Sequence, residues 1–170
     1  MTNDKPARDQ NQSEAATTEP AAAVVPAPTS PAGPTIVVGI GASAGGLEAY
    51  EAFFRHLPAD SGLTFVLVQH LDPGHTSLLS EILQRCTAMP VLEAADQMTT
   101  APNTVYVIPP NREMTLCNGS LRVSAPALPR GQRMPIDTFF RSLADDQGEN
   151  AVGIILSGTG SDGTLGLRAI

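Results

Sequence analysis

Apolar, largely β-branched runs alternate with amphipathic segments along most of this chain. Such runs, bounded by glycine and proline, are typical of buried parallel strands, and the segments between them have the spacing of surface helices. Alternation of this kind predicts an α/β fold, a doubly wound and mainly parallel sheet with helices on both faces. The predicted strands cover residues 35–40, 63–69, 91–93, 104–108 and 151–156, and the predicted helices cover residues 47–56, 76–85, 136–143 and a last stretch from 164.

One segment departs from this alternation and predicts a hairpin. Residues 114–117 and 120–123 are two short runs of alternating polarity, joined by Asn118-Gly119. Asn-Gly favours a two-residue turn, because both turn positions need a positive φ. We therefore expect an edge β-hairpin in addition to the parallel sheet.

The first 34 residues lack any apolar periodicity. They are rich in alanine, contain six prolines and hold no aromatic residue. A segment of this composition cannot bury enough apolar surface to offset the entropy of ordering it. We predict a disordered tail over residues 1–34 and a single domain over residues 35–170. The last predicted helix reaches Ile170 without a glycine, asparagine or proline stop signal, so we expect the natural domain to continue beyond it.

Composition narrows the classes of partner and compartment. The net charge is −7 and the basic residues are scattered, which argues against nucleic acid or an anionic membrane surface as the main partner. No apolar run approaches the length of a membrane span. Cys86 and Cys117 show no CxxC spacing, so we expect reduced thiols in a cytoplasmic protein and no metal site. Asp96, Asp145, Asp146 and Glu149 are interpreted as solvated surface charge.

Three predicted strands end at or just before residues that can take part in catalysis. Ser43 follows the first strand within Gly41-Ala-Ser-Ala-Gly45, His70 ends the second, and Asp162 follows the last within Ser157-Gly-Thr-Gly-Ser-Asp-Gly163. The carboxyl ends of parallel strands meet at one edge of a sheet, where such sheets bind ligands. The first motif matches G-x-S-x-G, in which glycines leave room for a sharp turn at a nucleophilic serine. We predict a serine hydrolase with Ser43 as nucleophile, His70 as general base and Asp162 as the residue that orients it.

Other interpretations of the same residues stay open. Gly39-Ile-Gly-Ala-Ser-Ala44 also fits the G-x-G-x-x-A dinucleotide fingerprint, although the second strand then ends in Gln69-His70 rather than in an acid, with Asp72 close by. An aspartate beside glycine is often only a turn or cap residue. His75 is a second candidate for the base, and His56 is assigned a structural role near a helix end.

The three motifs together resemble a known family. Ile36-Val-Val-Gly-Ile-Gly-Ala-Ser-Ala-Gly-Gly, Val68-Gln-His-Leu-Asp-Pro-Gly-His-Thr-Ser-Leu-Leu and Gly153-Ile-Ile-Leu-Ser-Gly-Thr-Gly-Ser-Asp-Gly are similar to motifs of the CheB-type protein-glutamate methylesterase catalytic domain. The order Ser43, His70, Asp162 differs from the Ser-Asp-His order of the α/β-hydrolases, so the G-x-S-x-G match does not indicate that family.

The resemblance implies a function and a set of site residues. Members of the family hydrolyse γ-glutamyl methyl esters on bacterial chemoreceptors, release methanol and deamidate certain receptor glutamines. It implies Ser43, His70 and Asp162 as the catalytic triad, backbone N–H groups of Ala44 and Thr159 as oxyanion donors, and no metal or organic cofactor. The expected partners are methyl-accepting chemoreceptors. Residues 156–168 are also similar in sequence to family members that are fused to a receptor methyltransferase, so such a methyltransferase is a second expected partner. A non-catalytic receptor-binding module is the third hypothesis.

Overall fold

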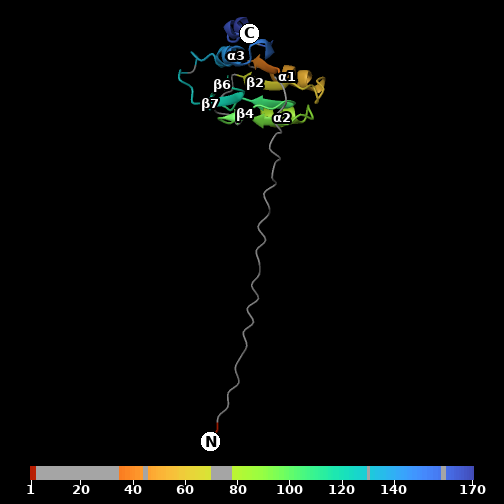
Figure 1. Ribbon diagram of the computed structural model, residues 1–170, viewed down its shortest axis with the longest axis vertical. Coiled ribbons are helices and arrows are strands. Elements are labelled where there is room, and N and C mark those ends of the chain that lie inside the picture. Colours follow the sequence, from red (N-terminus) through yellow and green to blue (C-terminus); the bar gives the residue numbers. More distant parts are fainter. Residues whose placement is uncertain (3–34, 44–45, 70–77, 130, 158–159) are drawn as a thin grey trace.

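The computed structural model describes residues 1–2, 35–43, 46–69, 78–129, 131–157 and 160–170. Within these residues a five-stranded parallel sheet forms the centre of the domain, with helices packed around it (Figure 1). Its strands are hydrogen-bonded in the order β3-β5-β2-β1-β8. The strands are β1 Val37–Ala42, β2 Thr64–Gln69, β3 Val91–Glu93, β5 Thr104–Val107 and β8 Ala151–Ser157. The predicted mainly parallel α/β sheet is confirmed.

Helices cover both faces of this sheet, as the alternating pattern predicts. The helices of the described residues are α1 Gly46–Arg55, α2 Leu79–Gln84, α3 Pro135–Gln147 and α4 Thr164–Ala169, with a 3₁₀ turn at Gly148–Asn150. One apolar cluster joins Tyr50 and Phe54 of α1 and Leu83 of α2 to the sheet. A second cluster packs Phe139 and Phe140 of α3 against the opposite face. Helices α1, α2 and α3 are therefore stabilised by burying an apolar stripe against the strands.

The predicted hairpin forms and belongs to a small second sheet. Strands β6 Glu113–Cys117 and β7 Ser120–Ser124 pair with each other, and β4 Met98–Thr99 pairs with β7. Asn118 and Gly119 have φ values of 50° and 67°, as a turn with two positive φ residues requires. The sequence pattern did not predict β4, because two residues are too short a run to show alternation.

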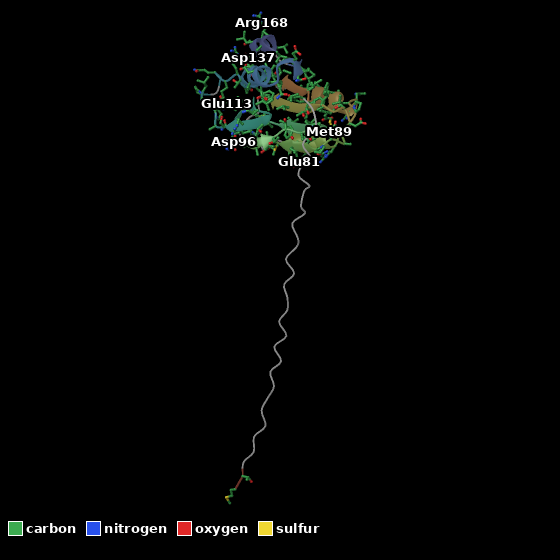
Figure 2. The ribbon with its side chains drawn as sticks, in the orientation of Figure 1. Glu81, Met89, Asp96, Glu113, Asp137 and Arg168 are labelled. Atoms are coloured by element: carbon green, nitrogen blue, oxygen red, sulfur yellow. The ribbon has the colours of Figure 1, made fainter. Side chains whose placement is uncertain are left out.

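Side chains of α3 hold this small sheet to the domain. The Leu116 amide donates to Ser142 Oγ at 3.0 Å, and the Gly119 and Asn118 amides both donate to the carboxylate of Asp146. The Asp96 carboxylate accepts a hydrogen bond from the Val123 amide at 3.1 Å, and its side chain lies beside the small sheet (Figure 2). Asp96 is exposed, as the interpretation of solvated surface charge expects, and Asp146 is partly buried. Both carboxylates also accept hydrogen bonds from backbone N–H groups of the hairpin.

Two glycines of β1 let α3 approach the sheet closely. A Cβ on Gly39 would lie 2.9 Å from both Leu143 Cδ2 and Phe140 Cε1, and one on Gly41 would lie 2.6 Å from Ile136 Cγ2. Both distances are well below an ordinary carbon contact. The strand residues without side chains thus form a groove that the apolar stripe of α3 fills.

This packing predicts that a single methyl group at position 41 destabilises the domain. We expect Gly41→Ala to lower the free energy of unfolding by about 1–3 kcal/mol, the usual cost of overpacking. Gly160→Ala is the control, because its Cβ would meet no described atom within 4 Å. Denaturant titration of both variants tests the prediction, and equal stability of the two would contradict it.

Candidate active site

The three strands that carry the predicted site residues end at the same level. In the parallel register Ala42 of β1 pairs with Gln69 of β2 and with Ser157 of β8. The Ser43 amide continues the ladder by donating to the Ser157 carbonyl oxygen at 3.0 Å. Ser43 and the last residues of β2 and β8 thus lie at one edge of the sheet, where parallel sheets bind ligands.

The turn after Ser43 uses a different glycine from the one that the G-x-S-x-G motif suggests. Gly41 lies within β1, and the chain turns only after Ser43, whose carbonyl oxygen accepts a hydrogen bond from the Gly46 amide at 2.9 Å. A Cβ on Gly46 would collide with Ala42 Cβ. The expectation that Gly41 makes room for the turn is therefore wrong: Gly41 makes room for α3, and Gly46 makes room for the turn into α1.

This finding also bears on the dinucleotide alternative. In that fingerprint the glycines form the turn between strand and helix. Here Gly39 and Gly41 are strand residues that pair with both β2 and β8. The last residue of β2 is Gln69, so the strand does not end in the acid that a ribose would need. The geometry therefore disfavours a dinucleotide site.

An irregularity in the pairing of β1 with β8, a β-bulge, lies next to this edge of the sheet. The β1–β8 register shifts between Gly41, which pairs with Ile155, and Ala42, which pairs with Ser157. Because side chains alternate between the two faces along a strand, this shift of one residue places the Ser157 side chain on the same face of the sheet as the Ala42 side chain. Its hydroxyl lies 3.4 Å from the position that a Cβ on Gly46 would take, and it is buried with no hydrogen-bond partner among the residues that the structure describes. Sequence reasoning did not identify Ser157 as a site residue.

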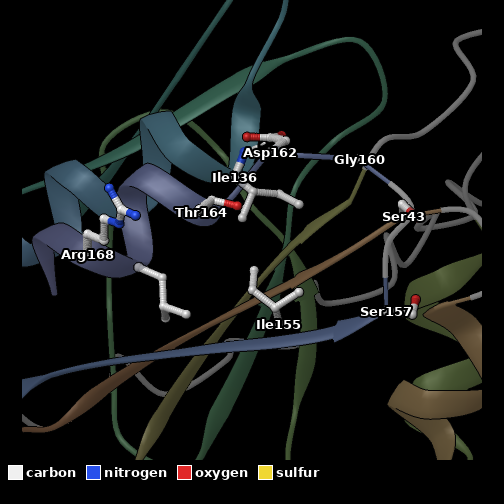
Figure 3. Close-up of a pocket in the computed structure, with 9 residues that line it drawn as sticks. Ser43, Ile136, Ile155, Ser157, Gly160, Asp162, Thr164 and Arg168 are labelled. Carbon is white, nitrogen blue, oxygen red and sulfur yellow. Dashed lines mark hydrogen bonds between the residues drawn. The ribbon is translucent and has the colours of Figure 1, made fainter.

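Asp162 accepts two hydrogen bonds from the start of α3. Its Oδ2 atom accepts from the Ile136 amide at 3.1 Å and its Oδ1 atom accepts from the Asp137 amide at 2.8 Å. Figure 3 shows the carboxylate beside Ile136 at the first turn of this helix. Pro135 opens α3, and its N-cap residue Met134 makes no side-chain cap. Asp162 therefore satisfies N–H groups that a helix otherwise leaves without partners.

Ser43 and Asp162 line one cavity of about 550 Å³ (Figure 3). The volume is that of an ordinary small-ligand pocket. Ile136 of α3, Ile155 of β8 and Leu167 of α4 make up its apolar lining, while polar groups come from the sheet edge and from Thr164 and Arg168 of α4. Its lining residues are Ser43, Ile136, Ile155, Ser157, Gly160, Asp162, Thr164, Leu167 and Arg168.

Tyr50 ties α1 to the strands that lead into the site. Its hydroxyl lies 3.3 Å from the Ile40 carbonyl oxygen and 3.4 Å from the Val68 carbonyl oxygen. Burial raises the pKa of this hydroxyl, so it remains a hydrogen-bond donor across the physiological pH range. The helix that follows Ser43 is thus held against β1 and β2 near the ends of both strands.

Several predicted site residues lie outside the described residues: His70, His75, Ala44 and Thr159. His56 directly follows α1, and its Nδ1 atom lies 2.7 Å from the Ala52 carbonyl oxygen in the last turn. Over the described ranges, no group of three or more His, Cys, Asp or Glu side chains is arranged to hold a metal ion. None of the described helices is long and apolar enough to cross a membrane.

Comparison with known families decides what this site belongs to. The model of the CheB methylesterase family matches residues 38–170, which is most of the chain. The chain belongs to the CheB methylesterase family. This confirms the resemblance seen in the three sequence motifs, and the match includes both Ser43 and Asp162.

Named relatives and a solved structure agree. A protein-glutamate methylesterase/protein-glutamine glutaminase of Photorhabdus laumondii is 39% identical over 136 residues, which is 77% of this chain and 38% of the relative. A second relative, the protein-glutamate methylesterase/protein-glutamine glutaminase 2 of Burkholderia lata, is 38% identical over 151 residues, which is 88% of this chain and 44% of the relative. The crystal structure of the Thermotoga maritima CheB methylesterase catalytic domain matches with a TM-score of 0.70 and 27% identity, covering 79% of this chain and 74% of that one. The chain thus spans about two fifths of the length of these two CheB relatives.

The contact of Asp162 with α3 predicts a structural cost for its removal. We expect Asp162→Ala to lower the free energy of unfolding by about 1 kcal/mol, as loss of a helix cap commonly does. Asp145→Ala is the matched control, because Asp145 is an exposed carboxylate on the same helix. Denaturant titration measures both, and a variant as stable as the control would contradict the capping role.

The buried hydroxyl of Ser157 predicts an opposite effect. Because a buried polar group without a partner is costly, and the described part of the chain offers Ser157 Oγ none, we expect Ser157→Ala to raise the free energy of unfolding by about 1 kcal/mol. Ser157→Thr, which keeps the hydroxyl, is the comparison. A fall in stability for the alanine variant would show that the hydroxyl has a stabilising partner in solution.

Proposed function

We propose that this domain is a serine esterase that removes methyl esters from glutamate side chains of bacterial chemoreceptors and deamidates certain glutamines of the same receptors. Its membership of the CheB methylesterase family and the names of its relatives support this activity. In the proposal Ser43 is the nucleophile, His70 is the general base and Asp162 orients the base.

The observation that carries the proposal is that strands β1, β2 and β8 end at the same level of the sheet. Ala42 pairs with both Gln69 and Ser157, so the residue that precedes His70 lies beside the residue that precedes Ser43. On the other side, the Ser157 carbonyl oxygen holds the Ser43 amide. Ser43 and Asp162 line one cavity at this edge. These contacts support a reaction centre assembled from three separate segments of the chain.

The proposed reaction runs through an acyl-enzyme. His70 takes the proton of the Ser43 hydroxyl while Ser43 Oγ forms a bond to the ester carbonyl carbon. The bond to the methoxy oxygen then breaks, and methanol leaves with the proton returned from His70. A water molecule attacks the acyl-enzyme by the same route, which frees Ser43 and the glutamate. For a glutamine substrate the leaving group is ammonia.

Two backbone N–H groups, those of Ala44 and Thr159, are proposed to stabilise the negative charge on the carbonyl oxygen. The support is their position in the chain: Ala44 directly follows Ser43 and precedes Gly46, where α1 begins, and Thr159 belongs to the glycine-rich sequence between Ser157 and Asp162. The amino end of a helix carries partial positive charge and presents N–H groups. No cofactor takes part in this mechanism.

The proposed setting follows from the substrate. The expected partners are methyl-accepting chemoreceptors, whose methylated glutamates the enzyme would meet in the cytoplasm. A receptor methyltransferase, fused to this domain or acting beside it, would supply the esters that the domain removes. The net charge of −7 argues against nucleic acid as a competing partner.

The proposal predicts that a single hydroxyl carries the activity. We expect Ser43→Ala to lower methanol release from a methylated chemoreceptor cytoplasmic fragment by at least about 10⁴-fold, because the remaining residues supply no nucleophile. Ser124→Ala is the matched control, because Ser124 is an exposed serine at the end of β7 and is not among the cavity-lining residues.

The outcome separates the hypotheses. Release by the parent and by Ser124→Ala, with none by Ser43→Ala, supports the esterase and its nucleophile. If the folded parent releases no methanol from a fragment that a known methylesterase demethylates, the proposed activity is wrong. Binding of the fragment that survives Ser43→Ala in that case would favour the receptor-binding module.

A further inference from the structure

Asp137 is a buried carboxylate in the first turn of α3 that the proposed reaction does not use. Its side chain is 7% exposed, although charged side chains rarely lie inside a domain without partners. Its Oδ1 atom accepts a hydrogen bond from the Gly166 amide of α4 at 2.7 Å. Asp137 therefore caps the amino end of the neighbouring helix.

The two helices exchange caps. The residue before α4 is Gly163, which has no side chain to offer and a φ of 96°, and the residue before α3 is Met134, which makes no side-chain cap. Instead Asp162, next to the start of α4, accepts from the Ile136 and Asp137 amides of α3. Asp137 of α3 accepts from Gly166 of α4. We call these contacts the reciprocal caps.

Together the reciprocal caps close a ring. The chain runs from Asp162 to Gly166, the Gly166 amide bonds to the Asp137 carboxylate, and the Asp137 amide bonds back to Asp162. The helices are close enough to keep the ring small, because Gly166 lies against α3. A Cβ on Gly166 would lie 2.6 Å from Phe140 Cβ and 3.0 Å from Asp137 Cα.

We propose that Asp137 is a positioning residue for Asp162. Its carboxylate holds the start of α4 against α3, and this contact keeps the Asp162 carboxylate at the amino end of α3, where the cavity lies. Asp137 acts through Asp162 and has no contact with substrate in this role. The inference rests on the proposed function for its effect on catalysis, whereas its effect on the position of Asp162 is independent of any reaction.

Hydrogen exchange measures that position directly. The Ile136 amide donates to Asp162 Oδ2, so its exchange rate reports whether the carboxylate stays in place. In Asp137→Ala we expect exchange at Ile136 to accelerate about 10-fold or more, while the amide of Val66 in the central strand β2 exchanges as in the parent. Asp137→Asn keeps an oxygen that can accept from Gly166, so we expect it to restore the slow exchange.

Kinetics measure the consequence. We expect Asp137→Ala to lower kcat for methanol release about 10²-fold with little change in KM, because a small displacement of a catalytic group costs this much. Asp137→Asn should recover most of that loss. Asp145→Ala, an exposed carboxylate of the same helix, should behave as the parent in both measurements.

Methanol release and hydrogen exchange test the proposed function and the positioning role separately. A parent that releases no methanol contradicts the proposed function, and exchange at Ile136 then decides the positioning role alone. Unchanged exchange at Ile136 in Asp137→Ala overturns the inference, and so does accelerated exchange with a parental kcat. If Asp137→Ala does not fold, Gly166→Ala breaks the same contact from α4, because its Cβ would press on Phe140. The same two readouts apply to it.

Discussion

The close approach of α3 to β1 is the constraint on which the rest of the domain depends. Gly39 and Gly41 have no side chains, so Leu143, Phe140 and Ile136 fill the space directly above the central strand. A helix at this distance places its amino end next to the carboxyl edge of the sheet. The same helix holds the hairpin through Ser142 and Asp146 and meets α4 through Asp137. One shape match between strand and helix thus positions the small sheet, the last helix and one wall of the cavity.

Much of this architecture could be predicted from local pattern. The parallel strands, the helices between them and the Asn118-Gly119 turn each depend on neighbouring residues, and all three are found. Ser43 and Asp162 also follow from chain order, because they come after strands whose ends meet at one edge. Chain order applies equally to His70, Ala44 and Thr159, which lie outside the described residues, so for these residues the sequence is the whole basis of the proposal.

What local pattern did not predict are contacts between distant segments. A turn motif explains the glycines near Ser43 by their neighbours in the chain, whereas the residue that explains Gly41 is Ile136, about 95 positions away. The role of Asp146 depends on a turn 27 residues away. The bulge that turns Ser157 arises from the register of β8 against β1, which no single strand reveals. Each of these features is a property of a pair of elements, and periodicity describes only one element at a time.

Asp162 shows that a structural and a catalytic interpretation of one residue need not compete. An aspartate beside glycine is often a cap, and Asp162 is one, although it caps α3 rather than the helix that follows it. A carboxylate offers about four acceptor positions, so accepting from the Ile136 and Asp137 amides and accepting an imidazole N–H are compatible roles for one side chain. Bonds to a helix amino end also fix the direction of the carboxylate, which a residue that orients a base requires. The cap is therefore a means of holding the acid still, and the proposed catalytic role depends on the structural one.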